Sequence, residues 1–219
     1  MSDAHDDAVM ADYYGRRAPL YDHMYREVGP DLRTPMLDDM IATVSGRRVL
    51  ELASGTGFWS EWLAPFYDQL VGVDVAPEML AIARARPIAP GKAEFRQGSV
   101  YDLAELPADF GAAIAIQWFS HVPAARYAEF FAALHGRLLP GARVFLADNI
   151  RQPHETDPLI PRAGTADTYE VRSLPDGSQF EIVKNYFAPG QFERIVPPAA
   201  RDLRVQFGKT WWWLTYALA

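Results

Sequence analysis

The stretch RVLELASGTG, residues 48–57, decides the fold predicted for this chain. It begins as a short apolar run typical of a buried strand, and the run ends in a Ser-Gly-Thr-Gly turn. Residues 58–66 then carry apolar side chains at helical spacing. A strand, a glycine turn and a helix in this order predict the first unit of a parallel sheet whose strands are joined by helices.

The same alternation continues along the chain. Further strands are predicted at 70–75, 93–97, 111–117 and 142–147, and helices at 11–26, 33–44, 77–86 and 124–139. Because crossovers between parallel strands are right-handed, these elements predict a doubly wound α/β fold with helices on both faces of the sheet.

The sequence changes character after residue 150. Two strand-like runs flank Pro175-Asp176-Gly177, which predicts an antiparallel hairpin after the fifth strand. Residues 189–196 predict a short helix, and 201–207 with 211–218 predict a closing pair of strands. The main sheet is therefore expected to be Rossmann-like, mainly parallel and seven-stranded.

The amino-acid composition and net charge disfavour several classes of function. The 219 residues carry 21 basic and 28 acidic side chains, and a net charge of −7 disfavours nucleic acid and anionic membranes as partners. Cysteine is absent and the five histidines are scattered, so no metal site is expected. Residues 1–10 do not resemble a signal peptide, and no apolar run approaches the ~18 residues that span a membrane. A cytoplasmic protein is expected.

Acidic residues and glycines at the first two strand ends indicate a ligand site. Gly55 and Gly57 would let a nucleotide-like ligand approach the backbone, although turns also use glycine for conformational reasons alone. Glu51 is an acid on an apolar strand, where burial without a partner is costly. Asp74 follows the turn at about the spacing, roughly 20 residues, at which an acid binds ribose hydroxyls. The alternative for Asp74 is a helix cap.

Several segments in order resemble the class I S-adenosylmethionine-dependent methyltransferases, in particular those acting on small molecules. VLELASGTGFWS (49–60) resembles their first motif and VGVDVAPEML (71–80) their acidic second motif. FRQGSVYDL (95–103), IQWFSHVP (116–123) and LLPGARVFLADN (138–149) resemble their later strand-end segments. The similarity spans roughly residues 11–150.

The resemblance implies which residues bind S-adenosylmethionine and its product S-adenosylhomocysteine. Glu51, Gly55 and Gly57 would hold the methionine part, and Asp74 both ribose hydroxyls. Val75 and Met79 would flank the adenine, unless Met79 only packs in the core. The expected cofactor contacts further include Ala53, Gly98, Ser99, Val100, Gln117 and Trp118.

One position departs from the family pattern. Many relatives have an aspartate after the glycine of the third motif, where this chain has Ser99 after Gly98. The backbone of Ser99 and Val100, or the Ser99 hydroxyl, would then bind the adenine amino group. Asp102 lies close by and fits a helix cap equally well.

The N-terminal aromatic residues Tyr13, Tyr14 and Tyr21, together with Arg17, resemble the mobile segment that closes over the cofactor in this family. Such a lid would exclude water from the reacting groups. The same helix-compatible spacing also fits an aromatic stripe in a core.

His121 is the candidate catalytic residue. It follows the fourth predicted strand, and doubly wound sheets bind ligands at the carboxyl ends of their strands. It would act as a base near neutral pH or only position the acceptor. Residues 169, 172 and 184–186 are interpreted as solvated strand positions, with projection toward the acceptor pocket as the alternative. Residues 211–213 are interpreted as core, with an aromatic pocket or a subunit contact as the alternative.

The expected function is methyl transfer from S-adenosylmethionine to an O, N or C atom of a small organic molecule, by a monomer or homodimer. The alternatives are an NAD(P)-dependent oxidoreductase and a non-catalytic S-adenosylmethionine-binding protein. The oxidoreductase is disfavoured because Ser60 stands where its third glycine would be. One domain over 1–219 is expected, divided into a lid region (11–45), a cofactor-binding core (46–150), an acceptor-side hairpin (151–186) and a closing segment (187–219).

Overall fold

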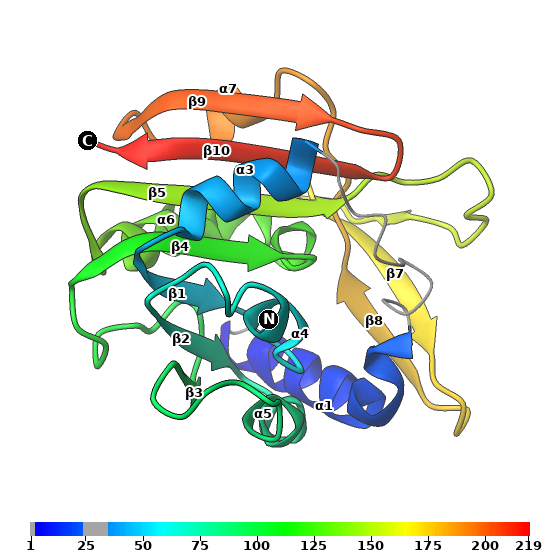
Figure 1. Cartoon of the computed structure of the whole chain (residues 1–219). Coiled ribbons are helices and arrows are strands. Elements are labelled where there is room, and N and C mark those ends of the chain that lie inside the picture. Colours follow the sequence, from blue (N-terminus) through cyan, green and yellow to red (C-terminus); the bar gives the residue numbers. More distant parts are fainter. Residues whose placement is uncertain (1–2, 24–34) are drawn as a thin grey trace.

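The computed structural model describes residues 3–23 and 35–219. Figure 1 shows a twisted sheet with helices on both faces and a smaller sheet beside it. In chain order the elements are α1 (Asp3–Tyr21), α3 (Pro35–Val44), β1 (Arg48–Leu52), α4 (Phe58–Trp62), β2 (Gln69–Asp74), α5 (Pro77–Arg84), β3 (Ala93–Gln97), β4 (Phe110–Ile116), the 3-10 helices η1 (Phe119–His121) and η2 (Ala124–Arg126), α6 (Tyr127–His135), β5 (Leu138–Asn149), β6 (Ile160–Pro161), β7 (Thr168–Ser173), β8 (Gln179–Val183), α7 (Phe192–Ile195), β9 (Ala200–Phe207) and β10 (Trp211–Leu218).

The seven-stranded sheet has the order β3-β2-β1-β4-β5-β10-β9. The first five of these strands pair in parallel, and β10 is antiparallel to both of its neighbours. This topology confirms the predicted doubly wound, mainly parallel sheet with a closing pair of strands. The strand order reverses between β1 and β4, which is where such sheets bind ligands.

Two apolar clusters cover the faces of the sheet. Leu50 and Leu52 of β1 pack in the cluster that includes residues of α6 and α7, whereas Val49 packs in the one that includes residues of α3, α4 and α5. Alternate residues of a strand point to opposite faces, so Trp212 and Trp213 of β10 likewise belong to different clusters. Trp212 and Trp213 therefore pack in the hydrophobic core, on opposite faces of the sheet.

The region before β5 differs from the sequence prediction. Instead of one helix over 124–139, a 3-10 turn precedes α6, and α6 ends at His135. Strand β5 already begins at Leu138, which pairs with Phe110 before the register shifts. Gly141 has a left-handed φ of 78° in this irregular stretch, so the Pro-Gly signal marks a bulge within a strand and not a helix end.

The predicted hairpin is present as β7 and β8, and it pairs with β6 in a three-stranded sheet of its own. Figure 1 shows this small sheet beyond the arrowheads of β1, β2 and β4. Helix α1 packs against both α5 and β8. The expected helices 11–26 and 33–44 correspond to α1 and α3, and residues 24–26 and 33–34 lie outside the described residues.

Candidate active site

A cavity opens at the carboxyl edge of β1, β2 and β4. It holds about 740 Å³ including its open mouth, a size common for small-molecule sites. Predicted residues on its wall are Tyr14, Tyr21, Ala53, Gly55, Asp74, Val75, Met79, Val100, Gln117, Trp118 and His121. Met10, Tyr101, Ile116, Pro123 and Arg126 also line it and were not predicted. Tyr101 and Ile116 stand next to predicted residues, whereas Arg126 carries no sequence signal.

The backbone at the strand ends adopts unusual conformations. Gly55 and Gly57 have left-handed φ angles of 53° and 70°, and so do two non-glycine residues, Ala53 at 50° and Gln117 at 57°. Such conformations are costly for residues with a Cβ, and they concentrate at functional sites. Gly57 is not on the cavity wall, but a Cβ there would lie 3.0 Å from the Cβ of Ala83. This glycine therefore lets α5 pack closely against the turn.

The Asp74 carboxylate ties the glycine turn to the end of β2. Its Oδ2 accepts the backbone N–H of Gly55 at 2.8 Å, and its Oδ1 accepts that of Ala76 at 2.9 Å. The N-cap residue of α5 is Ala76, so Asp74 does not cap this helix. Burial raises the pKa of Asp74, and its backbone hydrogen bonds oppose this rise. Three backbone N–H groups, those of Gly55, Val75 and Ala76, therefore hold this carboxylate on the cavity wall.

Glu51 lies behind the turn and not on the cavity wall. It is buried, and its Oε2 accepts the hydroxyl of Ser60. Tyr67 in turn donates its hydroxyl to the Ser60 carbonyl at 2.9 Å. Burial raises the pKa of Glu51 to about 7, although the Ser60 hydrogen bond opposes the shift.

The segment after β3 reaches the cavity through Val100 and Tyr101. Gly98 donates its N–H to the Asp74 carbonyl at 3.0 Å, and the Ser99 hydroxyl accepts the N–H of Tyr101 at 3.3 Å. Neither Gly98 nor Ser99 lines the cavity. The Arg126 guanidinium stacks on the Tyr101 ring, 3.4 Å from its centroid.

His121 in η1 is held between two elements. Its Nδ1 lies 2.6 Å from the carbonyl oxygen of Val183, so we assign the proton to Nδ1. The unprotonated Nε2 then accepts the hydroxyl of Tyr14 at 3.0 Å. Burial and nearby Lys184 lower the pKa of His121, and burial raises the pKa of Tyr14 well above its ordinary value. Near neutral pH the pair is a neutral imidazole and a neutral phenol.

Helix α1 contributes Met10, Tyr14 and Tyr21 to the cavity wall. Tyr13 instead packs on Phe180 of β8, with ring centroids 5.5 Å apart. The predicted lid residues thus stand between the cavity and the small sheet.

The end of α1 is tied to the glycine turn by contacts that we call the Arg86 latch. Arg86 forms an ion pair with Asp22 and another, at 2.8 Å, with Glu61. It also donates to the Thr56 carbonyl at 2.8 Å, and the Thr56 hydroxyl donates to Asp22 at 2.5 Å. No local motif indicates this latch, because it joins residues far apart in the sequence.

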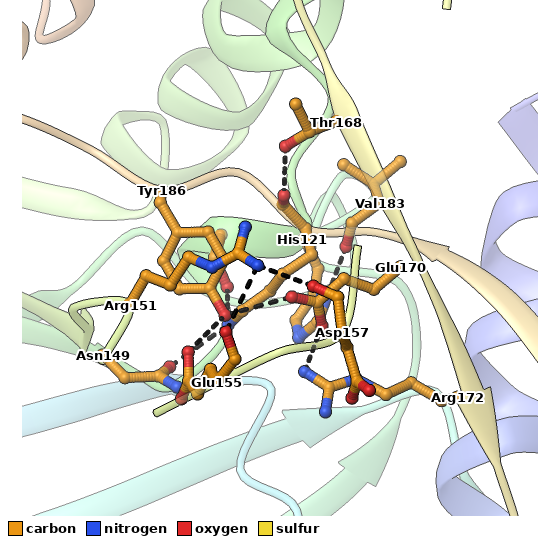
Figure 2. A network of polar contacts seen from close by, with 12 residues as sticks. His121, Asn149, Arg151, Glu155, Asp157, Thr168, Glu170, Arg172, Val183 and Tyr186 are labelled. Carbon is orange, nitrogen blue, oxygen red and sulfur yellow. Dashed lines mark hydrogen bonds and ion pairs between the residues drawn. The ribbon is translucent and has the colours of Figure 1, made fainter. Parts of the chain in front are cut away.

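A second pocket adjoins the cavity. Both share Tyr14, Tyr21, Gln117 and His121, and the second pocket is further lined by Tyr13, Arg17, Asn149, Glu155, Arg172, Ile182 and Lys184. Lys184 and Asn185 are buried, so their interpretation as solvated strand positions is wrong. Figure 2 shows polar contacts that link the hairpin to the segment after β5, among them Tyr186 with Glu155 and Glu170 at 3.3 and 3.1 Å.

Neither a membrane-spanning helix nor a metal-binding cluster is found among the residues that the structure describes. Among them, no helix is both long and apolar enough to cross a bilayer. In the same residues, no three His, Asp or Glu side chains gather in a way that could bind a metal ion.

Comparisons with known proteins identify the family. Residues 49–141 match the family described as "Methyltransferase domain". A protein of Xanthomonas campestris pv. campestris (strain B100) named ubiquinone biosynthesis O-methyltransferase is 31% identical over 172 residues, which make up 77% of this chain and 69% of that protein. The chain belongs to the class I S-adenosylmethionine-dependent methyltransferases.

Further similarities fit this methyltransferase assignment. A protein of Xanthomonas euvesicatoria pv. vesicatoria (strain 85-10) with the same name is 30% identical over 150 residues, 68% of this chain. The chain spans only 59% of that relative's length. Among solved structures, DhpI in complex with SAH superposes with a TM-score of 0.81 at 26% identity, covering 100% of this chain and 99% of DhpI.

Proposed function

We propose that this chain transfers the methyl group of S-adenosylmethionine to an O, N or C atom of a small organic molecule. The adjoining pockets carry the proposal, since one offers the glycine turn with Asp74 and the other a separate place for an acceptor. Relatives named as O-methyltransferases and the DhpI complex with SAH support it.

The residues of the first cavity fit S-adenosylmethionine. Asp74 presents its carboxylate to the ribose hydroxyls, and Val75, Met79 and Val100 offer apolar walls for the adenine. When bound, S-adenosylmethionine supplies a methyl group on a cationic sulfur. Glu51 supports the turn through Ser60, from behind the wall.

The remaining residues orient the acceptor and exclude water. Tyr14 and His121 stand on the wall that the two pockets share, where an acceptor must meet the methyl group. Helix α1 covers this place and keeps out water, which would weaken the attraction between a nucleophile and a cationic sulfur.

The proposal extends to the domain organisation of the chain and to its partners. We assign one domain over 1–219, with 11–45 as lid, 46–150 as cofactor-binding core, 151–186 on the acceptor side and 187–219 closing the sheet. The net charge of −7 supports a metabolite and not nucleic acid as acceptor, and the absence of cysteine suits the reducing cytoplasm. A monomer or homodimer is expected.

A thermal-shift titration with S-adenosylhomocysteine, NADH and NADPH tests the proposal. A ligand at 100 times its dissociation constant adds about 2.7 kcal/mol, or roughly 5–11 °C for a domain of this size. We expect this shift with S-adenosylhomocysteine alone, lost in Asp74→Asn and kept in the control Glu105→Gln, an exposed position. A shift with NADH or NADPH would favour an oxidoreductase. Binding of S-adenosylhomocysteine without methyl transfer to a broad acceptor panel would favour the non-catalytic alternative.

A further inference from the structure

Arg17 places a positive charge in the second pocket, and no carboxylate among the described side chains forms an ion pair with it. Its side chain is half-buried, and the rings of Tyr13, Tyr14 and Tyr21 surround its guanidinium carbon at 5.2, 6.0 and 5.4 Å. Its hydrogen bond runs to the Tyr13 hydroxyl at 2.8 Å. Among the described side chains, those of residues 8–23 and 35–219, no ion pair joins it to Asp or Glu. A guanidinium has five donors and favours oxyanions.

The other two cations of the pocket are already paired. Arg172 forms an ion pair with Glu170. Lys184 lies 3.5 Å from Asp148 and donates to Ser120 and Asn149 at 2.7 and 3.1 Å.

The acidic residue on the wall of the second pocket makes its hydrogen bonds to groups other than Arg17. Glu155 accepts hydrogen bonds from the Tyr186 hydroxyl and from the backbone N–H of Gln152. Three cations and one carboxylate line the pocket, and among the described side chains Arg17 is the cation that no ion pair joins to a carboxylate.

The shared wall offers no group ready to take a proton. The Nδ1–H of His121 is held by Val183, and its Nε2 is occupied by the Tyr14 hydroxyl. Burial disfavours both the imidazolium of His121 and the phenolate of Tyr14, as the lowered and raised pKa values of these groups express. An acceptor that had to lose a proton during transfer would find no suitable base in this pair.

We propose that the methyl acceptor is an oxyanion, a carboxylate or a phosphonate-type group, that pairs with Arg17 and is methylated on oxygen; this inference rests on the proposed function. The oxygen–carbon bond forms from an electron pair that the oxyanion already carries. The carbon–sulfur bond breaks and its electron pair stays on sulfur, so the negative and positive charges cancel and no proton moves.

The test uses protein saturated with S-adenosylhomocysteine, so that failure of cofactor binding shows separately. Propionate, ethylphosphonate and the neutral propionamide are titrated by thermal shift into parent protein, Arg17→Gln and Arg17→Lys. The control is Arg16→Gln, an exposed neighbour paired with Asp12 and Asp176.

We expect one or both anions to bind the parent protein and Arg16→Gln, and about 10-fold or more weaker binding to Arg17→Gln. Arg17→Lys should recover part of this loss, and propionamide should not bind. Binding of propionate indicates a carboxylate acceptor, and binding of ethylphosphonate indicates a phosphonate-type acceptor. Equal binding of propionamide, no anion binding, or equal losses in Arg16→Gln and Arg17→Gln would overturn the inference. Absence of S-adenosylhomocysteine binding would instead overturn the proposed function.

Discussion

Glu51 couples pH to stability through a single buried proton. Burial raises its pKa to about 7 in the folded protein, against an ordinary value of 4.5. Between these pH values the folded protein holds a proton that the unfolded chain releases. The stability that this proton contributes is therefore fully present below about pH 4.5, and it is lost as pH rises through about 7.

Glu51→Gln, which has no proton to lose, should flatten this dependence. We expect the free energy of unfolding of the parent protein to fall by on the order of 3 kcal/mol relative to the variant as pH rises from about 4.5 to 7.5. Urea denaturation at several pH values measures the difference. Glu105→Gln, at an exposed position, should follow the parent curve. Parallel curves for the parent and Glu51→Gln would contradict the raised pKa.

The protonation state of His121 is a second prediction for a single residue. Because burial and Lys184 lower its pKa, the imidazole should stay neutral, with the proton on Nδ1, from about pH 5.5 to 8. Nitrogen-15 NMR of labelled histidine measures this directly, with exposed His154 as the internal reference. Protonation of His121 between pH 6 and 7.5 would restore it as a candidate base.

Tyr14→Phe removes the hydroxyl that Nε2 accepts, so it separates positioning from proton transfer. Losing one hydrogen bond to a buried group costs about 0.5–1.5 kcal/mol, which corresponds to a roughly 2- to 13-fold slower methyl transfer. A positioning role predicts the same factor at every pH. A loss that grows as pH falls through neutrality would show that the pair handles a proton.

Among the elements, the central strands follow most closely from sequence. The predicted strands 48–53, 70–75 and 111–117 agree with β1, β2 and β4 to within one residue at each end, because central parallel strands are short, continuous apolar runs. Helix ends follow less well, because a long-range strand pair such as Phe110 with Leu138 overrides a local Pro-Gly signal. Secondary-structure propensity depends on residues near in sequence, whereas strand pairing joins residues that are far apart in sequence.

The same distinction limits prediction of the candidate site. The glycine turn and Asp74 each lie in a local motif and were found, and the cavity wall includes Gly55 and Asp74. Lys184 was misread, because a two-residue alternation cannot tell which face of a hairpin another layer covers. The Arg86 latch joins segments with no shared motif.

The Arg86 latch leads to a prediction for helix α1. Arg86→Gln removes two ion pairs, one of them to Asp22 at the end of α1. We expect S-adenosylhomocysteine to bind roughly 10-fold more weakly, mainly through faster dissociation, because the covering helix opens more often. Stopped-flow binding gives both rate constants. Arg16→Gln, which breaks two exposed pairs, one with Asp12 of the same helix and one with Asp176 of the hairpin turn, should change neither. An unchanged dissociation rate in Arg86→Gln would show that the latch does not hold the cover.

At the scale of the whole molecule, two parts of unequal packing meet at the cavity. The seven-stranded sheet and its helices hold the two large apolar clusters. Helix α1 and the small sheet pack through two much smaller ones, centred on Tyr13 with Ile182 and on Ala18 with Met79. Since regions with few buried apolar contacts open first, α1 and β8 should exchange their amide protons faster than β1 or β4.

A ligand in the cavity would touch both parts, because the wall takes Tyr14 from α1 and Asp74 from β2. Any opening that requires the ligand to dissociate becomes rarer when ligand is present. With the ligand at 100 times its dissociation constant, such openings become about 100-fold rarer. Hydrogen-exchange mass spectrometry with S-adenosylhomocysteine should therefore show slowed exchange in α1 and η1, and little change in α3 and β9, which contribute nothing to the wall. Uniform protection would mean that the molecule opens only as one unit. Unchanged exchange in α1 would mean that this helix does not cover the bound ligand.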